Sequence, residues 1–245
     1  MRRRDSKTRV HMINYDLLKA EGERLGINLS DIALDRFDLL AQRLVRWNEH
    51  INLTAITEPD EIVVKHFADS LTALYGNKIP PQASVIDVGC GAGFPSLPML
   101  IARPDLEVTF LDSVGKKLSF IKEILKNAGL FGEVLHERAE DIGKDRDYRE
   151  DFDVAVSRAV APLNVLAEYC LPLVKVGGLF IALKGARSEA ELGESAIDTL
   201  GGKIEQIVSL ELSNGESRNI VFVRKISHTP TKYPRKSKKI DTRPL

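Results

Sequence analysis

The fold of this chain is decided by Val85-Ile86-Asp87-Val88-Gly89-Cys90-Gly91-Ala92-Gly93-Phe94-Pro95, an apolar run that leads into a glycine-rich turn and a helix start. Such a run is typical of a buried parallel strand, and glycines at alternate positions let the backbone approach a ligand closely. The dinucleotide fingerprint needs its third glycine one position later, where this chain has Phe94. The stretch therefore predicts a site for a nucleotide-like ligand other than a dinucleotide.

The order acid, x, Gly, x, Gly, x, Gly, with Asp87 at the strand end, resembles the first motif of S-adenosylmethionine-dependent methyltransferases. A second acid, Asp112, ends the next apolar run, 21 residues after Gly91. A carboxylate at that strand end can accept hydrogen bonds from both hydroxyls of a ribose. The alternative is a glycine turn that only packs, with Asp112 as a helix N-cap. We favour the ligand site, because three glycines and a correctly spaced acid seldom coincide.

The chain divides into segments of different pattern. After Ser30, apolar residues recur at helical spacing, and a further helix is expected to start at Pro59. Beyond residue 83, strand and helix patterns alternate. We expect a disordered basic extension (1–12), an N-terminal helical segment (13–82), a methyltransferase domain (83–228) and a basic C-terminal tail (229–245).

Seven strands are predicted in the methyltransferase domain, and the last two are joined only by Ser213-Asn214-Gly215, which favours an antiparallel hairpin at the sheet edge. This pattern is usual for a methyltransferase core. The expected fold is α/β, a seven-stranded Rossmann-like S-adenosylmethionine-dependent methyltransferase fold preceded by the helical segment. The predicted strands are 84–88, 107–112, 133–136, 152–157, 179–183, 204–212 and 219–225, and the predicted helices between them are 96–102, 116–128, 163–173 and 188–200.

The formal net charge is zero, yet basic residues are concentrated at the two ends. Residues 1–10 hold five basic residues and one acid, and residues 229–245 hold six basic residues and one acid. For the first end we favour a solvated extension. For the C-terminal tail, which contains Arg235 and Lys236, we favour contact with nucleic acid, because lysines and arginines that meet phosphates release counterions.

Composition also limits the cellular setting. No apolar run approaches the roughly 20 residues of a membrane span, and the N-terminus lacks the apolar segment of a signal peptide. Cys90 and Cys170 are in no Cys-x-x-Cys pair or metal-ligand cluster. We therefore expect a cytoplasmic protein with neither a membrane partner nor a metal.

Ligands of such sheets lie beyond the carboxyl ends of the strands. Glu140, after the third strand, is placed to take an adenine amino group, and Arg158, at the end of the fourth, borders the expected position of the methyl group. A surface ion pair is an equal alternative for the arginine.

The fourth strand continues as Ser157-Arg158-Ala159-Val160-Ala161-Pro162 and lacks the Asn/Asp-Pro-Pro-aromatic turn of enzymes that methylate exocyclic amino groups. Neither cysteine is placed as a nucleophile for cytosine C5. Guanine N7 is an acceptor that needs no general base, because its lone pair carries no proton. Catalysis would then rest mainly on positioning.

With these residues the chain resembles the bacterial small-subunit rRNA guanine-N7 methyltransferase family, RsmG, also called glucose-inhibited division protein B (GidB). The resemblance covers nearly everything from residue 13 to residue 245. The matching segments are Trp47-Asn48-Glu49, Ile51-Asn52-Leu53-Thr54, Lys65-His66-Phe67-Ala68-Asp69-Ser70, Asp87 to Pro95, Leu111-Asp112-Ser113, Lys116, Arg138-Ala139-Glu140, Ser157-Arg158-Ala159, Ala182-Leu183-Lys184 and Thr229-Pro230 to Lys236.

The resemblance implies transfer of a methyl group from S-adenosyl-L-methionine to N7 of one guanine in the decoding region of 16S rRNA, free or in the small ribosomal subunit. Arg158 is then the candidate catalytic residue, and His66 is expected to be structural because attack by N7 needs no base. The implied cofactor residues are Gly89, Gly91, Phe94, Asp112, Ala139, Glu140 and Arg158. The implied RNA ligands are Lys116, Arg138 and Lys184, to which the tail adds Arg235 and Lys236.

Two other functions remain open at this point. One is a methyltransferase for a small molecule or a protein side chain, which would make the basic tail incidental. The other is a non-catalytic rRNA-binding assembly factor that kept the cofactor fold. We expect the protein to be a monomer.

Overall fold

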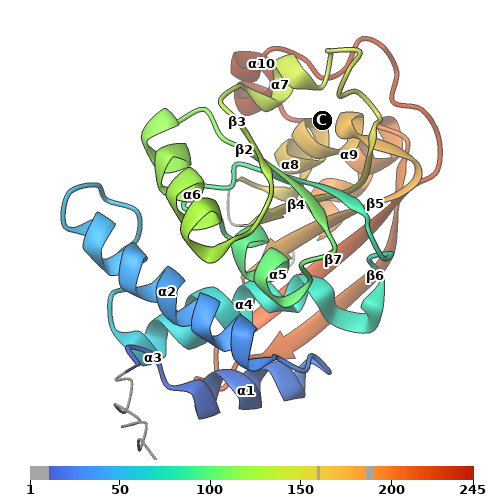
Figure 1. Ribbon diagram of the computed structural model, residues 1–245. Coiled ribbons are helices and arrows are strands. Elements are labelled where there is room, and N and C mark those ends of the chain that lie inside the picture. The colour runs from blue at the N-terminus through green and yellow to red at the C-terminus, as the bar shows by residue number, and fades with distance from the viewer. Residues whose placement is uncertain (1–10, 159–160, 186–189) are drawn as a thin grey trace, which may run out of the picture.

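The computed structural model describes residues 11–158, 161–185 and 190–245 (Figure 1). Most of the predicted disordered extension (1–12) therefore lies outside the described residues. The same is true of residues 188 and 189, the predicted start of the helix 188–200. Within the described ranges, no helix is long and apolar enough to cross a membrane.

The N-terminal segment is helical, as its spacing predicts. Helices α1 (Tyr15–Arg24) and α2 (Asp31–Asn48) come first, and the Ser30 side chain caps α2 by accepting from the amide of Ala33 at 3.2 Å. The helix expected from Pro59 is irregular. It runs through α3 (Pro59–Glu61), a π-helix η1 (Ile62–Ala68), α4 (Asp69–Leu71) and a 3-10 stretch η2 (Thr72–Asn77).

All seven predicted strands form one sheet of order β3-β2-β1-β4-β5-β7-β6. The pairs among the first five strands are parallel, and the predicted terminal hairpin is antiparallel with β6 at the edge. β5 begins five residues before its predicted start, because Val174 pairs with Phe152 ahead of a register shift in the ladder. The bounds are β1 (Ser84–Val88), β2 (Glu107–Leu111), β3 (Glu133–Leu135), β4 (Phe152–Arg158), β5 (Val174–Lys184), β6 (Gly202–Glu211) and β7 (Ser217–Lys225).

Helices cover both faces of the sheet (Figure 1). The N-terminal helices, α5 and α6 share one core, in which Phe37, Phe67 and Phe110 are fully buried, while α8 and α9 pack with Phe180 on the other face. The remaining helices are α5 (Ser96–Ala102), α6 (Gly115–Ala128), α7 (Ala139–Ile142), α8 (Leu163–Cys170), η3 (Leu171–Leu173), α9 (Ala190–Thr199) and α10 (Ser237–Thr242).

The C-terminal tail is folded against the domain and does not project as an arm. Tyr233 and Ile240 are buried, and α10 lies beside α7 and α8 (Figure 1). Arg235 makes an ion pair with Glu168 of α8, whose side chain is fully buried. The tail is therefore a docked segment despite its basic composition, and the sequence pattern did not predict this docking.

Candidate active site

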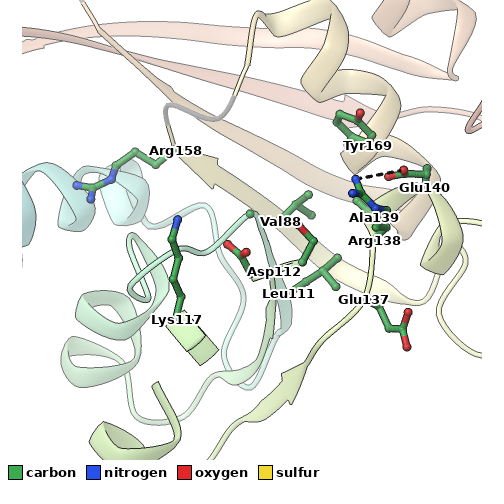
Figure 2. Close-up of a pocket in the computed structure, with 12 residues that line it drawn as sticks. Val88, Leu111, Asp112, Lys117, Glu137, Arg138, Ala139, Glu140, Arg158 and Tyr169 are labelled. Carbon is green, nitrogen blue, oxygen red and sulfur yellow. Dashed lines mark ion pairs between the residues drawn. The ribbon is translucent and has the colours of Figure 1, made fainter. Parts of the chain in front are cut away.

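A cleft of about 470 Å³ lies at the carboxyl ends of β1, β2 and β4, the edge at which parallel sheets bind ligands. Its walls come from four stretches of the chain that follow these strands and β3, with α8 closing one end (Figure 2). The lining residues are Val88, Gly89, Leu111, Asp112, Ser113, Lys117, Glu137, Arg138, Ala139, Glu140, Arg158 and Tyr169.

The glycine-rich turn forms the floor beside β1. Gly89 and Gly91 have φ angles of 74° and 57°, a region that favours glycine. The amides of Gly89 and Cys90 both donate to the carbonyl of Leu111, at 2.9 and 3.1 Å. Consequently the turn is tied to the end of β2, and the backbone rather than side chains faces the cleft.

Asp112 joins this turn to α6. One carboxylate oxygen accepts from the amide of Gly91 at 2.9 Å, and the other accepts from the amide of Val114 at 2.8 Å. Both oxygens keep further lone pairs, because a carboxylate has about four acceptor sites. The residue thus serves the local structure and still lines the cleft.

Asp87 lies beneath the turn and is fully buried. Its Oδ2 accepts from the hydroxyl and, at 3.3 Å, the amide of Ser96, whereas its Oδ1 has no hydrogen-bond partner within the described residues. Burial raises the pKa of this carboxyl from 3.8 to about 7. Burial therefore favours the protonated form of the group.

The far wall is built by the turn into α7 and by α8. Arg138 and the mostly buried Glu140 form an ion pair at 3.9 Å, drawn as a dashed line in Figure 2. The Tyr169 hydroxyl donates to Asp241 of α10 at 3.1 Å, and burial together with that carboxylate raises the pKa of Tyr169 to about 12. Sequence reasoning missed Tyr169 and Glu137, which no motif marks.

The lysine that lines the cleft is Lys117, the neighbour of the predicted RNA ligand Lys116. Lys117 lines the cleft and lies on the same side of it as Arg158 in Figure 2, while Lys116 is exposed and is not among the described residues that line it. Successive residues of a helix point about 100° apart, so only one of the two faces the ligand. The sequence does not show how α6 is oriented about its own axis, so it could not select between the two lysines.

Arg158 borders the cleft, but its guanidinium turns away from Asp112 towards the N-terminal segment (Figure 2). It binds Asp69 at 2.9 Å and the carbonyl of Lys65 in the π-helix at 3.3 Å. Its charge lies 5.0 Å from the centroid of the Phe94 ring. The arginine therefore connects the sheet to the helical segment through a largely buried ion pair, whereas the alternative expected from the sequence was a surface ion pair.

Phe94 and Gly91, both expected at the cofactor, are not among the described residues that line the cleft. The Phe94 ring stacks on His66 at 4.6 Å, behind the turn. Burial first, and then the charge of Arg158, lower the pKa of His66 to about 3. Arg158 donates to Nδ1 at 3.4 Å, so the proton is on Nε2, which donates to Thr54 at 2.7 Å.

Two predicted RNA ligands have other partners. The Lys184 ammonium is buried and donates to the carbonyl of Ala161 at 2.7 Å. The Arg235 side chain makes three hydrogen bonds to Glu168, at 2.8, 3.0 and 2.5 Å. Burial beside a partner removes both cations from the set available to phosphates, and we correct the prediction accordingly. Lys236 and Lys116 are exposed.

A seven-stranded sheet with a glycine turn and two carboxylates at its carboxyl edge defines a Rossmann-like S-adenosylmethionine-dependent methyltransferase. The family model for GidB, rRNA small subunit methyltransferase G, matches residues 33–221. The chain belongs to this family.

Individual relatives agree with that assignment. The chain is 45% identical over 240 residues to Ribosomal RNA small subunit methyltransferase G of Lactobacillus delbrueckii subsp. bulgaricus, covering 95% of this chain and 100% of the relative. It is 45% identical over 235 residues to the protein of that name from Alkaliphilus oremlandii, covering 94% and 98%. The structure of TrmN from Thermus thermophilus shares the fold, with a TM-score of 0.52, 17% identity and coverage of 67% and 53%.

Proposed function

We propose that this protein transfers a methyl group from S-adenosyl-L-methionine to N7 of a guanine in 16S rRNA. The observation that carries the proposal is the cleft in which the glycine turn, Asp112 and Glu140 converge. Membership of a family named for small-subunit rRNA methylation supports the substrate. A ribosomal RNA substrate would be met in the cytoplasm, and we expect the protein to act there as a monomer.

The residues of the cleft fit the proposed donor. Its volume is within the roughly 300–1,000 Å³ of small-molecule sites. Asp112 would accept from the ribose hydroxyls and Glu140 from the adenine amino group, with Tyr169 and Ala139 beside the base. The backbone of the turn, open at Gly89, would lie against the amino-acid part. Phe94 and Gly91 would support this site from behind.

Methyl transfer to guanine N7 requires no side chain that acts as an acid or a base. When bound, the donor supplies an electrophilic methyl group on a sulfonium; the N7 lone pair forms the new bond as the carbon–sulfur bond breaks, leaving S-adenosylhomocysteine and a cationic 7-methylguanine. No proton moves, so no base is required. His66, with a pKa of about 3 and its ring stacked behind Phe94, is neutral and structural.

Arg158 is assigned a positioning role rather than a catalytic one. Its guanidinium holds Asp69 and covers the Phe94 ring, so it fixes the N-terminal segment against the glycine turn. Lys117 and Arg138 also line the cleft and would meet the RNA there. Lys116 and Lys236 are exposed and remain candidates outside it.

The test is methyl transfer by the purified protein from labelled S-adenosylmethionine to 16S rRNA and to small subunits, followed by digestion to nucleosides. We expect the label in 7-methylguanosine, and loss of the label with Asp112→Ala. Label in another nucleoside, or none, would overturn the proposal. Turnover without rRNA would favour the small-molecule or protein enzyme, and absence of cofactor binding in a calorimeter would favour the assembly factor.

A further inference from the structure

A second cleft, of about 360 Å³, opens on the N-terminal helical segment. Five of its lining residues come from the end of α2 and the turn after it, and one comes from α6. They are Arg43, Arg46, Trp47, His50, Ile51 and Glu123. None of them lines the cofactor cleft, although Trp47 belongs to one of the segments that carry the family resemblance.

The walls of this cleft are held in place. The Trp47 indole donates to Glu123 at 3.0 Å and packs edge-on against Phe120, with 5.7 Å between centroids. Arg43 pairs with the other oxygen of Glu123 at 3.4 Å. The acid is thus occupied by internal contacts, and the indole is fixed before any ligand arrives.

Two groups in the cleft remain available. Arg46 and His50 are exposed, and their side chains make no hydrogen bond or ion pair with the described part of the chain. An arginine beside a fixed aromatic ring matches a nucleotide, because guanidinium groups bind phosphates and indoles stack on bases. The histidine adds a second ring on which a base can stack.

The cleft lies close to the cofactor site along α6, which runs beside α2 in Figure 1. Lys117, in the first turn of α6, lines the cofactor cleft, and Glu123 is six residues, or roughly 9 Å, further along the helix. Lys116 precedes Glu123 by seven residues and therefore lies on the same helix face. Lys116 and Arg46 are both exposed.

A second connection runs through the chain after α2. The Asn48 side chain accepts from the amides of Leu53 and Thr54, at 2.8 and 3.0 Å. Thr54 bonds His66, whose ring stacks on Phe94 at the end of the glycine turn. The position of this cleft is therefore fixed relative to the reacting centre.

We propose that the cleft of Arg46, Trp47 and His50 binds a nucleotide of single-stranded RNA that neighbours the methylated guanine. This inference rests on the proposed function. A guanine must leave its stack to enter the cofactor cleft, and its neighbours then lose stacking partners. The base stacks on Trp47 or His50, and Arg46 binds the phosphate. Occupancy of both clefts positions the target guanine, because stacking and a phosphate contact hold the neighbouring nucleotide whatever its base.

Trp47 is the only tryptophan of the chain, so its fluorescence reports this cleft directly. The probe is a 16S rRNA fragment that the wild-type protein methylates, added in the presence of S-adenosylhomocysteine. We expect the fragment to quench the fluorescence, while the cofactor product alone leaves it nearly unchanged. Binding is followed in parallel by the anisotropy of a dye on the RNA.

The test variants are Arg46→Ala and His50→Ala, and the control is Arg146→Ala, an exposed arginine that lines neither cleft. We expect Arg46→Ala to weaken RNA affinity about tenfold and to lower the salt slope by about one. Cofactor affinity stays unchanged in both test variants. Arg146→Ala behaves as the wild type in every assay.

RNA that binds without quenching Trp47, or Arg46→Ala with wild-type affinity and salt slope, would overturn the inference. Neither result affects the proposed function if the wild type still forms 7-methylguanosine. Failure of the proposed function is seen separately, as the absence of transfer by the wild type to any rRNA.

Discussion

Replacing Arg235 by alanine distinguishes two roles of the C-terminal segment: contact with RNA, which the sequence predicts, and docking on the domain, which the structure shows. Glu168 is fully buried and accepts four hydrogen bonds from Arg235, one from its amide at 2.7 Å and three from its guanidinium. Removing one partner of a buried ion pair costs about 3–5 kcal/mol. The amide remains after the substitution and Arg235 is 14% exposed, so we expect a loss near the lower limit, about 3 kcal/mol.

The substitution also reaches the cofactor cleft, because Glu168 precedes Tyr169, whose hydroxyl binds Asp241 of α10. Undocking the segment frees that tyrosine. We expect cofactor affinity to fall about tenfold, the equivalent of roughly 1.4 kcal/mol. Urea unfolding measures the stability, calorimetry the cofactor affinity, and limited proteolysis the release of residues 229–245.

Lys236→Ala is the matched control, since it removes the same charge from the next, exposed position. We expect it to change the free energy of unfolding by less than about 0.5 kcal/mol. If Arg235→Ala left stability and cofactor affinity intact and weakened only RNA binding, the docked-segment account would be wrong and the prediction of an RNA arm would stand.

Four further predictions concern the glycine turn and the groups beneath it. Asp112→Asn keeps the shape but removes one carboxylate acceptor, so cofactor affinity measured by calorimetry should fall at least tenfold, and an unchanged affinity would exclude the ribose contact. Gly93→Ala places a Cβ 2.4 Å from a leucine side chain at a φ of 87°, whereas Gly91→Ala at 57° meets open space. Urea unfolding should therefore show the first to be more destabilising, by about 1–3 kcal/mol, and equal losses would refute the steric argument. The pKa of His66 is about 3 in the folded state against an ordinary value of 6.5, so its contribution to stability is lost as the pH falls below about 6.5. His66→Gln should accordingly lose less stability than the wild type between pH 7.5 and 5. For Asp87, with a pKa raised to about 7, the sign is opposite: Asp87→Asn should gain stability relative to the wild type as the pH rises from 5 to 8. Parallel pH profiles of variants and wild type would contradict both.

The sheet could be predicted from the sequence because its signals are local. Each strand is a short apolar run between turn residues, and Ser213-Asn214-Gly215 leaves no room for a helix between the last two strands. The glycine turn and Asp112 follow from spacing in the same way. These features need no knowledge of distant contacts.

Properties that depend on packing could not be read from the sequence. Arg235 and Lys236 are neighbours of the same charge, yet only the first meets the buried Glu168, 67 residues away along the chain. Similarly, the partner of Arg158 is Asp69, and the partner of Lys184 is the carbonyl of Ala161. Burial and the choice of partner arise from tertiary contacts. The sequence therefore identified these basic residues, but it could not show that their partners lie inside the protein.

Reduction and aniline cleavage of 16S rRNA tests the central claim most directly, because the treatment cuts the chain at 7-methylguanine. The RNA is taken from cells with the gene, from cells without it, and from cells that carry the Asp112→Ala variant. We predict scission at one guanine only where the wild-type gene is present. Scission at that guanine in all three samples, or in none, would contradict the assignment of guanine-N7 methylation to this protein.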